Sequence, residues 1–207
     1  MHVAIALYPR FTALDAVGPY TVFAFAPGWT VTFVAATAGP VTDDAGSLTL
    51  QATAGYADLT EPDIVVVPGG PGTVEALADR ALLDWIASAR GHARWTTSVC
   101  SGSFLLGAAG LLDGRRATSH WGWLDQLATF GATPVGERVV RDGDIVTAAG
   151  VSAGIDMALS LLGQAVDDRT AQAVQLAIEY DPQPPYRCGS PATAPPGLPE
   201  TALSLIS

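Results

Sequence analysis

One short segment constrains the fold of this 207-residue chain more than any other. An apolar, strand-like run at 95–99 leads into a turn of small residues, Cys100-Ser101-Gly102, and a helix-like run at 103–109 follows at once. A strand, a sharp turn and a helix in this order form a nucleophile elbow, which lifts the turn residue above the edge of a sheet. The helix N-terminus points free N–H groups at Cys100, and these favour its thiolate form. The alternative is a buried cysteine with only a structural role.

The rest of the chain predicts buried strands that alternate with helices. We expect strands at 3–8, 30–36, 63–67 and 117–119, hairpins at 41–53 and 138–147, and helices at 14–25, 73–77, 81–90, 123–130, 152–162 and 169–180. A Gly-Pro pair at 18–19 should bend the first helix or delay its start. This alternation is typical of an α/β three-layer sandwich with a mostly parallel central sheet. In such folds the ligand lies beyond the carboxyl ends of the strands.

Charge and composition exclude several classes of function. The net charge is −10, with 10 basic against 20 acidic residues, which argues against a nucleic-acid partner. All the basic residues are arginine, so Schiff-base chemistry on lysine and a Walker A phosphate loop are excluded. The histidines and cysteines show no metal-site spacing, and no metal or other cofactor is expected.

The same composition bears on localisation. No apolar run is long enough to cross a membrane, and the N-terminus is typical of a first strand rather than of a leader. We therefore expect a cytoplasmic protein with no membrane partner. Its two cysteines, Cys100 and Cys188, form no disulfide framework, and Cys188 is interpreted as incidental.

Two loops beside the elbow carry residues suited to catalysis. The glycine loop at 68–72 lets a substrate approach its backbone closely, and the N–H groups of Gly70 and Ser101 would then stabilise developing negative charge. The alternative is a tight turn between a strand and a helix. Asp15 follows the first strand and would exchange a proton with the thiol or the substrate. Its alternative role is a charge that stabilises a helix N-terminus.

His120 is the histidine expected in a loop at the end of a strand. Paired with Cys100, it would generate a reactive thiolate, and Asp156 would either orient it or cap its own helix. The alternative is a histidine that packs beside Trp121 and bonds to the backbone.

Taken together, these motifs resemble the ThiJ/PfpI superfamily, a group with a glutamine-amidotransferase-like, flavodoxin-like fold. The resemblance covers residues 1 to about 180, which form a single domain, and leaves 181–207 as a proline-rich tail. It rests on five blocks that recur in order, at 15–23, 67–72, 98–103, 118–121 and 149–156.

Within that superfamily the chain is most similar to the isonitrile hydratase subgroup. The resemblance implies a lyase that hydrates an isonitrile to an N-substituted formamide, with Cys100 as nucleophile and Asp15 as its acidic partner. Ser101 stands where the subgroup has threonine, and with Gly70 it would hold developing charge. A homodimer and a small apolar substrate are implied, in a pocket that we expect to include Leu14, Trp121 and Val151. The alternatives are a glyoxalase-like enzyme acting on 2-oxoaldehydes and a redox sensor or protective protein in which Cys100 is oxidised.

Overall fold

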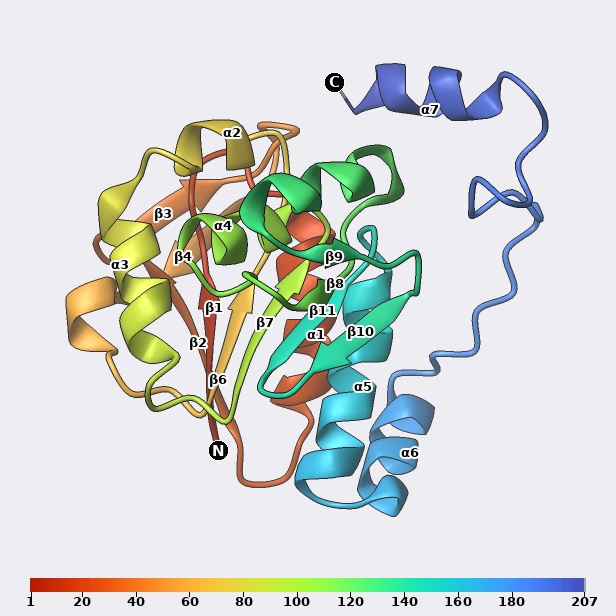
Figure 1. Ribbon diagram of the computed structural model, residues 1–207. Helices are drawn as coiled ribbons and strands as arrows, with labels where there is room; N and C mark the ends of the chain where they lie inside the picture. The colour runs from red at the N-terminus through yellow and green to blue at the C-terminus, as the bar shows by residue number, and fades with distance from the viewer. Residues whose placement is uncertain (207) are drawn as a thin grey trace.

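The computed structural model describes residues 1–206, which build a seven-stranded sheet between two layers of helices (Figure 1). Its strand order is β10-β11-β7-β6-β1-β2-β5. The strands are β1 (His2–Ala6), β2 (Thr30–Ala35), β5 (Ala54–Gly55), β6 (Ile64–Val67), β7 (Trp95–Val99), β10 (Val139–Asp142) and β11 (Ile145–Ala148). All neighbours run parallel except β10 and β11. The predicted α/β sandwich with a mostly parallel sheet is therefore confirmed.

Helices cover both faces of the sheet. One face carries α1 (Ala13–Ala24) and α5 (Ala153–Ala165), with α6 (Asp168–Ala177) packed against α5. The other carries α2 (Thr73–Ala76), α3 (Arg80–Ala89), α4 (Gly102–Ala108) and the 3-10 segment η2 (Trp121–Phe130). A shorter 3-10 turn, η1 (Tyr56–Asp58), packs beside α3. Pro19 lies inside α1, which runs unbroken from Ala13, so the late start that the Gly-Pro pair suggested is wrong.

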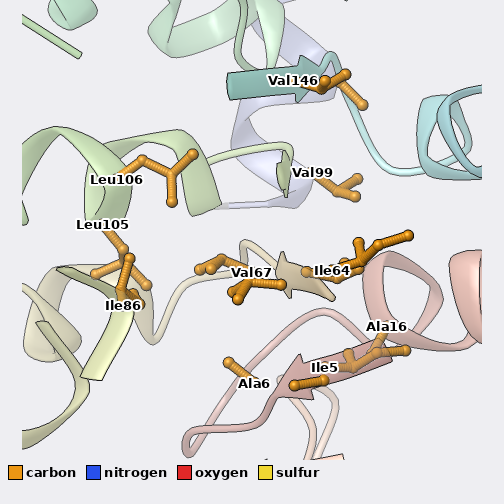
Figure 2. Packing of buried hydrophobic residues seen from close by; sticks show 14 of the residues in the cluster. Ile5, Ala6, Ala16, Ile64, Val67, Ile86, Val99, Leu105, Leu106 and Val146 are labelled. Atoms are coloured by element: carbon orange, nitrogen blue, oxygen red, sulfur yellow. The ribbon is translucent and has the colours of Figure 1, made fainter. Parts of the chain in front are cut away.

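The central strands are buried on both faces, as the unbroken apolar run in β6 predicts. Every residue of Ile64–Val67 is fully buried. Figure 2 shows Leu106 of α4 and Ile86 of α3 on one side of these strands and Ala16 of α1 on the other. The core therefore holds β1, β6 and β7 rigidly at the centre of the molecule, and their carboxyl ends meet at one edge.

Both predicted hairpins are confirmed. The first pairs β3 (Gly39–Thr42) with β4 (Thr49–Ala52), and the second pairs β10 with β11. The short strand expected near 117 is β8 (Arg116–Ala117), which pairs with β9 (Thr133–Pro134). No helix within residues 1–206 has the length and apolarity needed to cross a bilayer.

The tail contains a helix that the sequence analysis missed. After α6 the chain runs along one side of the body and ends in α7 (Leu198–Leu205), which lies above η2 in Figure 1. The sequence does contain a helix-start signal for α7: Gly197, which adopts a φ of 82°, precedes the helix, and a proline follows in its first turn. Proline at the first helical positions is favoured because its missing N–H has no helical partner there.

Candidate active site

Three loops meet at the carboxyl ends of β1, β6 and β7, and they touch backbone to backbone. A β-carbon at Gly102 of the elbow would lie 2.2 Å from the Val67 carbonyl oxygen. A β-carbon at Gly72 would lie 2.0 Å from the Pro9 carbonyl oxygen. Only glycine fits at such distances, so the glycine loop draws the elbow and the first loop together. This close packing places Cys100 and Asp15 side by side.

Cys100 sits in a strained backbone conformation that its surroundings hold in place. Its φ of 57° lies in the left-handed region, which is unfavourable for a residue with a side chain. The Cys100 N–H donates to the Ala149 carbonyl at 2.9 Å. Its own carbonyl accepts from the hydroxyls of Ser103, at 3.1 Å, and Ser119, at 3.0 Å. The thiol is thus fixed at the top of the sheet, where the elbow pattern predicts it.

Asp15 is completely buried beside Cys100. One carboxyl oxygen, Oδ2, accepts from the Gly69 N–H at 2.8 Å, while Oδ1 has no hydrogen-bond partner of good geometry among the described residues. Burial raises the pKa of Asp15 to about 7, against the lowering effects of the Gly69 N–H and the Cys100 side chain. The carboxyl therefore changes protonation near neutral pH, which suits an acid–base role.

Cys100 is 5% exposed and keeps its proton at neutral pH. Burial, followed by the negative charge of Asp15, raises its pKa to about 12. The N–H groups of Ser101 and Val151 and the Ser101 hydroxyl act in the opposite direction. The helix N-terminus favours the thiolate, but burial and the charge of Asp15 outweigh this effect, so the thiol is the resting form. Activation of the sulfur requires a neighbour that accepts its proton as it reacts.

Ser101 and Gly70 are bonded to each other. The Gly70 N–H donates to Ser101 Oγ at 3.0 Å, and that oxygen lies 2.9 Å from Thr73 Oγ1. The Ser101 N–H instead stabilises the Cys100 sulfur. The two N–H groups predicted as a pair therefore have separate partners here, and a direct bond from Gly70 to substrate stays a prediction that requires Ser101 to turn.

His120 is buried and packs against two indole rings. Its ring centre is 5.2 Å from Trp121 and 4.9 Å from Trp123, and its Nδ1 accepts from the Gly122 N–H at 3.2 Å. Burial lowers the pKa of His120, so the ring is neutral with its proton on Nε2. Asp156 is not available to orient it, because it pairs with Arg138. Among residues 1–206, no hydrogen bond joins His120 to Cys100.

A cavity of about 800 Å³ opens above Cys100. Val151 lines it as expected, whereas Leu14 and Trp121 are absent from its walls. Its lining includes the polar residues Arg10, Thr12, Asp44 and Glu75. It also includes the apolar residues Leu77, Phe104, Trp123, Val151, Leu205 and Ile206. Within the described chain, no three possible ligand side chains gather as a metal site would require. Cys100 thus lines a largely apolar cavity, and the carboxyl of Asp15 lies beside the thiol but is fully buried and does not line the cavity.

Sequence reasoning missed several residues that shape this site. The hydroxyls of Ser103 and Ser119 hold the Cys100 carbonyl, and the Val151 N–H stabilises its sulfur. Both serines lie inside blocks that carry the family resemblance, at 98–103 and 118–121, so small hydroxyl residues in these blocks were the available signal. The Val151 contact depends on a strained φ of 28°, which no local pattern signals.

Comparisons with known proteins identify a family and several relatives of this chain. Residues 1–164 match the model of the DJ-1/PfpI family. The chain is 46% identical over 202 residues to the isonitrile hydratase of Pseudomonas putida, covering 98% of this chain and 88% of that protein. A crystal structure of a ThiJ/PfpI family protein from Pseudomonas syringae superposes with a TM-score of 0.95 at 42% identity, over 99% of this chain and 85% of that one. Drosophila melanogaster DJ-1beta, at 20% identity, shares the fold with a TM-score of 0.77 over 86% of this chain and 97% of that one.

Proposed function

The chain belongs to the DJ-1/PfpI family, and from this premise we propose that it is a cysteine-dependent isonitrile hydratase. It would convert an isonitrile and water into an N-substituted formamide. The observation that carries the proposal is the contact between Cys100 and a buried Asp15 whose pKa is raised to about 7. The 46% identity to a hydratase over almost the whole chain supports the same reaction.

The first step joins the Cys100 sulfur to the terminal isonitrile carbon. As the S–C bond forms, Asp15 takes the thiol proton and delivers it to the same carbon. The product is a thioimidate, R–N=CH–S, and no oxidant or reductant is needed. A carboxyl with a pKa near the working pH serves both as acceptor and as donor in such a relay.

The second step consumes water. Its oxygen adds to the thioimidate carbon while Asp15 accepts one water proton and passes it to the nitrogen. The tetrahedral adduct, R–NH–CH(OH)–S, then collapses: the C–S bond breaks, and the hydroxyl proton passes through Asp15 to the Cys100 sulfur as the formamide leaves. The Ser101 hydroxyl, which bonds with Gly70 and Thr73 in the resting site, would bond the substrate nitrogen as charge develops there.

The proposal is tested by assaying the protein with benzyl isonitrile and, in parallel, with methylglyoxal. We expect N-benzylformamide by chromatography, no turnover of the 2-oxoaldehyde, and a transient mass increase on the Cys100 peptide equal to one isonitrile. Lactate formation without formamide would support the glyoxalase-like alternative. Neither product, with ready oxidation of Cys100 by peroxide, would support the redox alternative.

His120→Ala is expected to retain measurable turnover. The imidazole is neutral and makes no hydrogen bond to Cys100 within the described chain, so it shapes the cavity rather than ionising the thiol. The loss in kcat should stay below the roughly 100-fold that marks removal of a general base. Steady-state kinetics measures this loss in kcat, on a variant whose circular dichroism spectrum is native. A loss as deep as that of Cys100→Ala would instead assign His120 as the base.

A further inference from the structure

The C-terminal helix docks beside the active-site cavity. Leu203 Cδ2 occupies the space left free by Gly122, since a β-carbon at Gly122 would lie 2.5 Å from it. Gly122 belongs to η2, the segment that also carries Trp123 of the cavity wall. This contact fixes the end of α7, so the next two apolar residues, Leu205 and Ile206, line the cavity. Figure 1 shows α7 at the same end of the molecule as α2 and η2.

The mouth of the cavity exposes apolar side chains to water. Leu205 is 79% exposed and Ile206 39%, and Val74 of α2, which also lines the cavity, is 74% exposed. Contact between large apolar side chains and water is unfavourable, and a ligand that covers them gains from their burial. Because these side chains and Cys100 line one cavity, that ligand can be the substrate itself.

The shape of an isonitrile sends its substituent toward this mouth. The reacting carbon is terminal and must reach the Cys100 sulfur. The group R–N≡C is linear, so R projects away from the sulfur into the cavity, whose lining includes Phe104 and Trp123. A large aromatic group therefore reaches further from Cys100 than a short alkyl group does.

We propose that Leu205 and Ile206 are specificity-determining residues that contact the apolar substituent of bulky isonitriles. The proposal rests on the proposed function and deepens it, because it assigns a substrate class: isonitriles with a large, apolar, preferably aromatic group on nitrogen. The tail thereby supplies a wall of the substrate site, held in place by the contact of Leu203 with Gly122.

The test compares the double variant Leu205→Ala/Ile206→Ala with the wild-type protein on methyl and benzyl isonitrile. We expect kcat/KM for the benzyl compound to fall about tenfold and that for the methyl compound to change less than about twofold, as lost apolar contacts predict. Leu203→Ala, which loosens the docking, should shift the ratio in the same direction. Leu176→Ala is the matched control, since Leu176 lies on α6, is 80% exposed and does not line the cavity.

Equal losses on both substrates, or none, would overturn the proposal. So would an unchanged ratio together with an altered oligomeric state by size-exclusion chromatography, because the side chains would then serve contact between copies of the chain.

A second readout does not depend on isonitrile hydration. Cys100 is alkylated with N-methylmaleimide and N-benzylmaleimide, and its rates are followed by peptide mass spectrometry apart from those of Cys188. The benzyl-to-methyl ratio at Cys100 should fall in the double variant and hold in Leu176→Ala. If the wild-type protein hydrates no isonitrile, the proposed function fails, while this ratio still supports or overturns the wall assignment.

Discussion

Cys100→Ala is expected to abolish formamide production, with a loss of more than about 10⁴-fold, and to leave the fold intact. In the proposed mechanism the sulfur is the nucleophile of the first step and the leaving group of the second, and removing a nucleophile costs orders of magnitude in rate that neighbouring groups do not recover. Alanine keeps the β-carbon, so the strained backbone and the bonds from Ser103 and Ser119 remain possible. Chromatographic detection of formamide, with thermal unfolding measured in parallel, checks both parts.

Cys188→Ala is the matched control for this experiment. Cys188 is a free, partly exposed thiol in the tail, and it is absent from the cavity lining. Its removal should leave turnover unchanged. Near-wild-type hydration by a folded Cys100→Ala variant would rule out the covalent mechanism.

Asp15→Asn is expected to lower kcat by roughly 10²–10⁴-fold, the usual effect of losing a proton-transfer group. The amide oxygen still accepts from the Gly69 N–H, so the shape of the site persists, but the side chain no longer takes the thiol proton. Asp15→Glu should be less damaging, because it keeps the acid at a shifted position. Steady-state kinetics on both variants gives the comparison. If Asp15→Asn kept most of its kcat, the proton relay would have to run through water or His120.

The same variant has a stability signature that separates chemistry from misfolding. The pKa of Asp15 rises from 3.8 to about 7 on folding, so the folded state binds a proton that the unfolded state releases between those values. This contribution to stability is complete below about pH 4 and disappears as the pH rises through 7, a span worth up to about 4 kcal/mol. Asparagine carries no charge at any of these pH values. Asp15→Asn should therefore unfold at a higher temperature than the wild-type protein at pH 8, and a lower Tm there would contradict the burial argument.

The elbow, the glycine loop and Asp15 were accessible from sequence because each is encoded locally, by a turn of small residues or by its place after a strand. The protonation of Cys100 was not accessible. The helix N-terminus alone predicts a thiolate, and the opposite outcome follows from burial produced by three loops far apart in the chain. The position of α7 was hidden for a similar reason. Its start is marked by Gly197 and a following proline, but its docking depends on space that Gly122 leaves on another segment.

The backbone contacts among the three loops also determine where this enzyme can acquire new selectivity. At Gly72 and Gly102 a β-carbon would fall within 2.0 and 2.2 Å of a carbonyl oxygen, so these positions offer no side chain for mutation to tune. Part of the cavity wall comes instead from α4, η2 and α7, at positions such as Phe104, Trp123 and Leu205. Substitutions there leave the loops that align sulfur and carboxyl untouched. Under the proposed function, reaction chemistry and substrate choice are thus encoded in separable parts of the chain, and a directed-evolution library restricted to these wall positions would vary substrate choice while the reacting groups stay in place.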